Sequence, residues 1–187
     1  LNRGRLASVN EGKYVGSTPP YGYDKEKLKG QKGFKLVINE EEAKIVKEIF
    51  ERIAGGESAI EIVRSFNERK VPTRLLSQKG KSRYVSDHDR GDGLWDGTAI
   101  SDIVRDEGYT GVLIQNKIEL QGFGDSKKLV KRDKSEWTIV EHGMPAIVSK
   151  ELFEEANRVH PVVSMNNRNN KHRNVHLFVC PYCGRKL

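Results

Sequence analysis

The sequence is short of cysteine and of long apolar runs, and each shortage excludes a class of protein. Only two of its 187 residues are cysteines, which is too few for a disulfide-rich secreted fold. No run approaches the roughly 20 apolar residues that a membrane-spanning helix needs, and the N-terminus has no apolar signal-peptide core. The 18 glycines follow no triplet period, which excludes a collagen-like chain. We therefore expect a cytoplasmic protein, and the start at Leu1 rather than at methionine favours a piece of a longer chain.

Patterns typical of enzymes are also scarce. The five histidines are scattered, and there is neither a His-Glu-x-x-His pair nor a Walker-type glycine loop. No serine or threonine lies in a nucleophile elbow. Asp87, Asp89 and Asp92 cluster in a stretch where a cation site is conceivable, but a solvated loop is the more frequent explanation. We expect no covalent chemistry from this chain alone.

Positive charge is present in excess, and it is unevenly distributed. The chain has 33 Lys and Arg against 26 Asp and Glu, for a net charge of +7. Residues 69–83 contain six bases and no acid, residues 160–187 contain five bases and no acid, and a further basic cluster spans Lys127–Lys134. Residues 36–68, by contrast, contain four bases and eight acids. A solvated surface could explain any single cluster, but the set favours a polyanionic partner, above all nucleic acid.

Two consecutive helices are the clearest local prediction. Capping boxes begin at Asn39 and at Ser58, each with a glutamate three residues later. Apolar residues at helical spacing follow each cap, a Gly-Gly pair separates the two segments, and the second should end near Lys70. The sequence therefore predicts a helical hairpin.

Shorter elements complete the predicted fold, which is α+β: a helix-rich mixed domain with a helical hairpin, a helix-turn-helix-like element and a small β-sheet or hairpin, followed by a truncated zinc ribbon. Asp24–Gly33 is polar and is expected to be a loop. The remaining expected elements are a helix within Leu1–Glu11, a strand at Phe34–Ile38, a helix from the cap Thr98 to Asp106, a strand at Val112–Ile114, a β-hairpin between Lys117 and Lys134, a strand at Trp137–Val140 and a helix capped by Ser149.

The helices at 58–70 and 98–106 could form a helix-turn-helix with an enlarged turn. The second helix would then expose Thr98, Ser101, Asp102 and Arg105, and such short polar groups with one arginine suit a major groove. An ordinary amphipathic surface helix is the open alternative.

Basic and aromatic residues outside that helix are candidates for contact with the phosphate backbone or a minor groove, where arginine is favoured. They accompany the Pro19–Tyr23 segment and the basic stretch after Lys70. The full set of candidate DNA-binding residues is Arg3, Arg5, Lys13, Tyr21, Tyr23, Arg74, Lys79, Lys81, Arg83, Thr98, Ser101 and Arg105.

Cys180 and Cys183 form a Cys-x-x-Cys pair that follows an apolar stretch and precedes a glycine. This pattern is typical of half a zinc-ribbon site, because zinc takes four ligands in a tetrahedron. A redox motif would need the pair to open a helix, and nothing helical is expected there. His172 and His176 could complete a site, but they are better explained as bystanders. We expect weak zinc binding, or none, in this chain.

The segment Gly16-Ser17-Thr18-Pro19-Pro20-Tyr21-Gly22-Tyr23 resembles the segment that follows the long connecting helix in large serine recombinases, a family of phage-type integrases and mobile-element transposases. Further matching segments keep the family order: Glu42-Ala43, Gly56-Glu57-Ser58, Val71-Pro72-Thr73, Trp95, Tyr109-Thr110-Gly111, His142 with Pro145–Ser149, and the Cys180/Cys183 pair. The resemblance implies the end of the connecting helix at 1–14, a DNA-binding recombinase domain at 15–160, a linker at 161–174 and an incomplete zinc ribbon at 175–187.

The resemblance also implies a function. The family cuts and rejoins attachment-site DNA for integration, excision or transposition, as a tetramer assembled from DNA-bound dimers. The nucleophilic serine would lie in an N-terminal domain outside this chain, so no catalytic residue can be assigned here. Double-stranded DNA is the implied partner, with no membrane. Zinc would belong to the full-length bacterial or phage-encoded parent, and this fragment alone would be a monomer without tightly bound metal.

Two other functions remain compatible with the residues. One is a stand-alone helix-turn-helix regulator that binds DNA without recombining it. The other is a small metalloenzyme that uses Cys180, Cys183 and a histidine.

Overall fold

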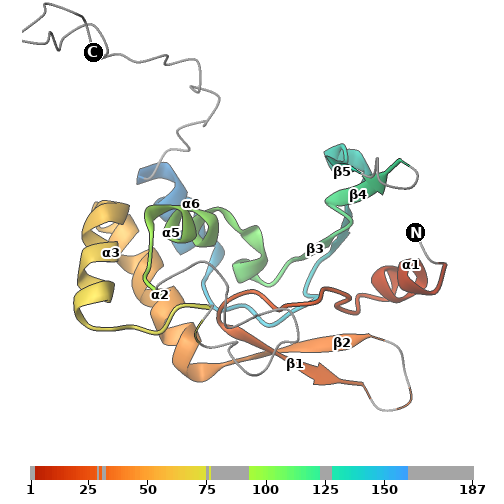
Figure 1. The fold of residues 1–187 in the computed structure, drawn as a ribbon, viewed down its shortest axis with the longest axis horizontal. Helices are drawn as coiled ribbons and strands as arrows, with labels where there is room; N and C mark the ends of the chain where they lie inside the picture. Colours follow the sequence, from red (N-terminus) through yellow and green to blue (C-terminus); the bar gives the residue numbers. More distant parts are fainter. Residues whose placement is uncertain are drawn as a thin grey trace, which may run out of the picture.

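The computed structural model describes residues 3–28, 30, 33–74, 76, 93–122 and 128–159. Within them, helices α2, α3, α5 and α6 gather at one end of the molecule, while α1 and the strand pair β4–β5 lie at the other (Figure 1). None of the described helices is both long and apolar enough to cross a membrane. The described elements are α1 (Arg3–Asn10), β1 (Tyr23–Lys27), β2 (Phe34–Ile38), α2 (Glu40–Ala54), α3 (Ala59–Glu68), α5 (Gly97–Arg105), the 3₁₀ helix η1 (Glu107–Thr110), β3 (Leu113–Gln115), β4 (Ile118–Gln121), β5 (Lys128–Lys131), the 3₁₀ helix η3 (Lys134–Glu136), β6 (Thr138–Val140) and α6 (Lys150–Val159).

The predicted helical hairpin is confirmed. At α3, the Ser58 hydroxyl accepts from the Glu61 amide at 3.3 Å, and the Glu61 carboxylate accepts from the Ser58 amide at 2.9 Å, so the capping box is complete. At α2, Asn39 caps the helix as expected, with its side-chain oxygen 3.3 Å from the Glu42 amide. The Glu42 carboxylate does not close a second box. It is buried and accepts instead from the Gly22 amide at 2.8 Å, which ties the Pro-Pro-Tyr-Gly-Tyr segment to the start of α2.

The described strands form three separate two-stranded antiparallel sheets. The pair β1–β2 aligns Tyr23 with Ile38 and Lys27 with Phe34. The expectation of a loop from Asp24 onward is therefore wrong for Asp24–Lys27. Burial declines along this strand, from the buried Tyr23 to the exposed Glu26 and Lys27. Its polar side chains therefore do not mark it as a strand, and it is held by backbone pairing with the more apolar β2. The other pairs are β3–β6 and the hairpin β4–β5, both at the predicted positions.

One hydrophobic core joins the helices α2, α3, α5 and α6 to the segment that contains Tyr21, Tyr23 and Leu36. Its largest fully buried side chains include Tyr23, Phe50 and Phe66, and the helices α2 and α6 pack closely against each other. Gly22 makes the tight packing of the preceding turn possible. Its φ is +92°, and an added Cβ would lie 2.8 Å from the Ile147 Cδ1 atom.

Helix α1 is attached to the domain through its own Val9 and through the residues that follow it. Val9 is fully buried, and the backbones of Tyr14 and Phe34 exchange two hydrogen bonds of 2.8 and 3.0 Å. The Gln115 side chain extends this pairing from β3, since its amide donates to the Lys13 carbonyl at 2.8 Å and its oxygen accepts from the Val15 amide at 3.1 Å. Gln115 thus imitates a strand partner for residues 13–15 and fixes the direction in which α1 leaves the domain.

Several predictions concern residues outside this description. The proposed linker at 161–174, the zinc ribbon at 175–187 with Cys180 and Cys183, and the basic residues Lys79, Lys81 and Arg83 all lie outside the described residues. These assignments stay predictions.

Candidate nucleic-acid interface

Helix α5 is the element that the sequence offers for reading DNA, and it begins earlier than expected. The cap is Asp96 rather than Thr98: its carboxylate accepts from the Ala99 amide at 2.8 Å, and the helix starts at Gly97. A carboxylate is as good a cap as a threonine hydroxyl and also favours the positive end of the helix dipole. Thr98 is therefore inside the first turn, where its side chain is exposed.

The two faces of α5 differ in character, as predicted. Ile100, Ile103 and Val104 are buried against the core. Thr98, Asp102 and Arg105 are exposed, and Ser101 is half-buried between them. The exposed face carries hydrogen-bond donors and acceptors at positions that a helix in a major groove would present to base edges.

The placement of α5 relative to α3 depends on one side chain. The Asn67 amide, near the end of α3, donates to the Trp95 carbonyl at 3.0 Å, and its oxygen accepts from the Trp95 amide at 2.8 Å. This satisfies both backbone polar groups of the residue that precedes the α5 cap. The start of α5 is thus fixed to α3 across 28 positions of sequence.

Trp95 is held by its ring as well as by its backbone. The indole N–H donates to the Val71 carbonyl at 3.0 Å. The ring meets Phe66 and Tyr21 edge-on, with centroids 5.3 Å apart in both cases. Such T-shaped contacts are favourable beyond the apolar area that they bury. The helix pair α3 and α5 therefore has a fixed geometry despite the long connection between them.

The C-terminal end of α5 is fixed by two further hydrogen bonds. Asn157 of α6 donates to the Val104 carbonyl at 2.8 Å. Tyr109 of η1 donates its hydroxyl to the Tyr21 carbonyl at 2.9 Å. Burial raises the pKa of Tyr109 well above its ordinary value, and the Asp106 carboxylate adds to this, so the phenol remains a donor.

The structure corrects the assignment of Tyr21 and Tyr23 as DNA contacts. Both side chains are buried. Their hydroxyls donate internally, from Tyr21 to the Pro72 carbonyl and from Tyr23 to the Pro145 carbonyl, each at 2.8 Å. An aromatic ring gains more free energy in this apolar core than at an exposed backbone contact, so the two tyrosines fasten the chain instead of touching DNA.

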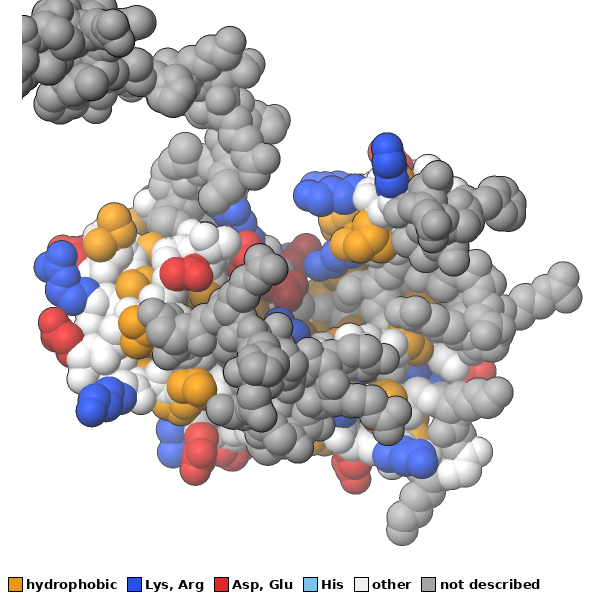
Figure 2. Space-filling view, in the orientation of Figure 1, with side chains coloured by type: hydrophobic (Ala, Val, Ile, Leu, Met, Phe, Trp, Pro, Cys, Tyr) orange, Lys and Arg blue, Asp and Glu red, His pale blue; other side chains and the backbone are white. Residues whose placement is uncertain are grey.

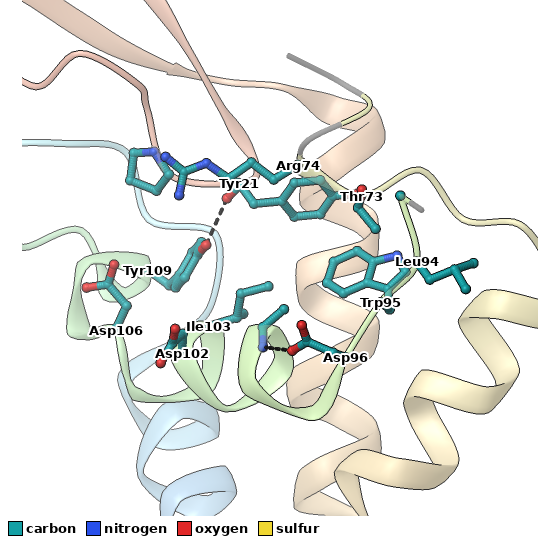
Figure 3. A pocket seen from close by; sticks show the side chains of 13 residues that line it. Tyr21, Thr73, Arg74, Leu94, Trp95, Asp96, Asp102, Ile103, Asp106 and Tyr109 are labelled. Atoms are coloured by element: carbon teal, nitrogen blue, oxygen red, sulfur yellow. Dashed lines mark hydrogen bonds between the residues drawn. The ribbon is translucent and has the colours of Figure 1, made fainter. Parts of the chain in front are cut away.

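A cavity of about 400 Å³ lies between the Pro20–Tyr21 turn and α5 (Figure 3). Its wall includes the aromatic rings of Tyr21, Trp95 and Tyr109. Arg74 reaches over the cavity from one side, and the carboxylates Asp102 and Asp106 border it from the α5 side. In the part of the chain that the structure describes, no group of three or more His, Cys, Asp or Glu could hold a metal ion. The cavity thus brings Arg74 beside α5 but offers no metal site among these residues.

Two arginines of the α2–α3 hairpin are engaged within the protein. Arg52 lies 3.0 Å from one Glu57 oxygen and 3.3 Å from Glu48. Arg69 also binds Glu48, and this hydrogen bond lowers the pKa of the Glu48 carboxyl. Arginines held in this way are less available to phosphates than Arg105, which is exposed on α5.

The other candidate residues lie at the opposite end of the molecule. Arg3 and Arg5 belong to α1, and Lys13 follows it (Figure 1). Lys13 is half-buried and ion-paired with Glu11. The structure therefore separates the candidates into a group around α5 that includes Arg74, and a group around α1. The DNA contacts of both groups stay predictions.

Two residues that organise the site were given no role in the sequence interpretation. Asn67 and Gln115 each satisfy two backbone groups far away in sequence. No local pattern marks either residue, because an amide side chain in a helix or at a strand end is ordinary unless its partner is known.

Solved structures share this fold. One, described as "Sequence Requirements of the Listeria innocua prophage attP site", matches with a TM-score of 0.51 at 16% identity and covers 98% of this chain and 62% of its own. Another, described as "Crystal Structure of a LSR-DNA Complex", matches with a TM-score of 0.51 at 17% identity and covers 98% of this chain and 46% of its own. The chain thus spans less than two thirds of the length of either. A search of curated proteins found no significant match.

A family sequence model provides the assignment that these distant structures leave open. It is described as Recombinase, and it matches residues 40–160, which run from the start of α2 to just beyond α6. Asn67, Trp95 and Asn157, which position α5, lie within this match. The chain belongs to the Recombinase family.

Proposed function

We propose that this chain is the DNA-binding part of a site-specific serine recombinase and that it recognises attachment-site DNA during integration, excision or transposition. The observation that carries the proposal is the geometry of α5. Its polar face is exposed, while both of its ends are tied to the core by Asn67, Asn157 and the Trp95 ring. A rigidly held helix with an exposed polar face is what base readout in a major groove requires.

The family assignment and the shared fold support the same proposal. The two similar structures are described by an attP site and by a DNA complex. The net charge of +7 favours a polyanionic partner. In this proposal Arg105 and Thr98 contact base edges, and Arg74 contacts the backbone beside them.

The remaining parts of the proposal concern the longer protein. In this proposal no residue of the chain is catalytic, and strand exchange would depend on a serine outside it. The parent would act as dimers on DNA that assemble into a tetramer. Zinc would be held in the parent by Cys180 and Cys183 together with further ligands. Two thiolates suit zinc, but they supply only half of a tetrahedral set.

Selection from a random duplex library, followed by binding at several salt concentrations, tests the proposal. We expect enrichment of one sequence class and a steep dependence on salt, with a slope of about −0.9 for each phosphate neutralised. Attachment-site half-sites, tested in parallel, should compete for the same surface. Equal affinity for the selected duplex and for random DNA would refute sequence recognition.

A further inference from the structure

The β4–β5 ribbon has two chemically different faces. The register pairs Ile118 with Lys131, and Leu129, two residues before Lys131 on β5, lies on the same face. The other face carries the pairs Glu119 with Val130 and Gln121 with Lys128. One side of the ribbon is thus mainly aliphatic, and the other is mainly polar.

The aliphatic residues of this face are exposed. Leu129 is 74% exposed and Ile118 is 53% exposed, and β4 and β5 pack chiefly on each other. Figure 2 shows hydrophobic and basic side chains next to one another on this ribbon. An isolated two-stranded ribbon is only marginally stable in water. Exposed aliphatic side chains on such a ribbon are unfavourably hydrated, and a bound partner that covers them would remove this free-energy cost.

The ribbon is nevertheless anchored at its base. Arg132 binds Glu119 at 2.6 Å and accepts a hydrogen bond at its carbonyl from the Trp137 indole at 3.2 Å. The Lys117 ammonium lies 5.6 Å from the centroid of the same ring. These contacts hold the ribbon in a defined direction away from the body, which Figure 1 shows.

The charges around the aliphatic face favour one kind of occupant. Residues 117–134 contain six bases and three acids. Arg132 is used internally, whereas Lys128 and Lys131 are exposed and form no ion pair within the described residues. A second copy of this chain would bring the same positive charge to the interface, and the lysines would repel. A polyanion would be attracted instead.

Duplex DNA satisfies both the charge and the apolar face. A major groove is about 12 Å wide and admits a two-stranded β-ribbon, and its floor presents thymine methyl groups to aliphatic side chains. Lysines at the edges of such a ribbon reach the phosphates that border the groove.

We propose that the β4–β5 ribbon is a second DNA-contacting arm, in which Leu129 and Ile118 face the bases. Lys131, on the same face, and Lys128, at the start of β5 on the other face, extend their long side chains to the phosphates that border the groove. The proposal rests on the proposed function, because it adds an arm to the DNA interface centred on α5. The arm lies at the far end of the molecule from α3, so it lengthens the stretch of DNA that one chain covers (Figure 1).

Footprinting and salt-dependent binding on one selected duplex test the arm. We compare the wild-type chain with Lys128→Gln/Lys131→Gln and with Leu129→Ser. All three positions are exposed, so the variants should fold. The matched controls are Lys44→Gln/Lys47→Gln, two exposed lysines on the acidic helix α2, and Ile60→Ser, an aliphatic residue on α3 that is 70% exposed.

We expect the double lysine variant to shorten the protected DNA at one end only. Its salt slope should become shallower by about 1.8, and its affinity near 0.1 M salt should fall roughly tenfold or more. Leu129→Ser should also lose protection at that end while keeping the slope. The control variants should retain the full footprint and the wild-type slope.

The outcomes separate the arm from the proposed function. If the wild-type chain protects no DNA, the proposed function fails and the arm fails with it. If the wild type binds but both ribbon variants keep its footprint and slope, only the arm is wrong. If Leu129→Ser abolishes a dimer seen by sedimentation and leaves DNA binding unchanged, the face serves self-association and the arm is overturned.

Discussion

The side-chain amide of Asn67 forms two hydrogen bonds with the backbone of Trp95, one as donor at 3.0 Å and one as acceptor at 2.8 Å. This pair replaces the short turn that normally sets the angle between the two helices of a helix-turn-helix. The connection between α3 and α5 is long, and the angle between the helices is nonetheless fixed by one residue at each side of it.

Replacing Asn67 should therefore disturb both stability and DNA reading. Asn67→Ala leaves two partly buried backbone groups without partners, and we expect a loss of about 1–3 kcal/mol in the free energy of unfolding. Urea denaturation measures this loss, with Glu68→Ala, an exposed neighbour on the same helix, as the control. Binding at a temperature where the variant is folded should show weakened base discrimination. An unfolding midpoint equal to that of Glu68→Ala would contradict the role given to this pair.

Arg105 is the residue of α5 expected to discriminate between bases. Arg105→Ala should relax the preference for one base pair by about 1–3 kcal/mol, because a bidentate arginine contact to guanine contributes about that much. Competition between duplexes that differ at single positions measures the effect. Lys150→Ala, an exposed cation on α6, should keep the discrimination of the wild type. Unchanged discrimination in Arg105→Ala would show that α5 is not the reading helix.

Gly22 should not tolerate a side chain. Gly22→Ala places a Cβ 2.8 Å from Ile147 Cδ1 at a φ of +92°, so strain and overpacking add together. We expect a loss of about 2–4 kcal/mol in the free energy of unfolding. Gly56→Ala is the matched control, since its φ is +90° but nothing lies within 4 Å of the added atom. Equal destabilisation by both variants would mean that packing at Gly22 contributes nothing.

Gln115 should control how firmly α1 is held. Gln115→Glu keeps an acceptor for the Val15 amide but sets a carboxylate against the Lys13 carbonyl, in place of the donated hydrogen bond of 2.8 Å. We expect faster hydrogen exchange at Val15 and in α1, with the exchange of α2 unchanged. Gln115→Leu should release both contacts and give a larger effect. If the amides of α1 exchange at the wild-type rate in both variants, Gln115 does not hold this helix.

The stability of the domain should fall at high pH. Burial raises the pKa of Tyr21, Tyr23 and Tyr109 above the ordinary value of 10.0, and nearby carboxylates raise it further. The unfolded chain therefore loses these protons first, so the stabilisation is complete below pH 10.0 and declines as the pH rises above it. Urea denaturation across this range, together with tyrosinate absorbance, measures the decline. Ionisation of all tyrosines before unfolding would contradict the burial of these three.

What could be predicted from the sequence was local. The caps at Asn39 and Ser58 lie next to the helices that they start, so the boundaries of α2 and α3 follow from adjacent residues. At α5 two capping residues, Asp96 and Thr98, lie within three positions, and a local pattern does not choose between them.

What could not be predicted depends on distant partners. Tyr21 and Tyr23 resemble exposed aromatic residues in a Pro-Gly turn, and only the hydrogen bonds to Pro72 and Pro145 place them in the core. The polar strand β1 exists because β2 pairs with it, and Gln115 has its function because residues 13–15 pass beside β3. Such contacts join parts of the chain up to 122 positions apart.

The α3–α5 connection is held at both ends, at Val71 by the Trp95 indole and at Trp95 by the Asn67 amide. The position of α5 relative to α3 is therefore set inside the domain, and a change in the length of the connection adds a loop-closure cost of only about 0.6 kcal/mol for each doubling. A domain with a shorter or longer connection could thus keep the same arrangement of these two helices.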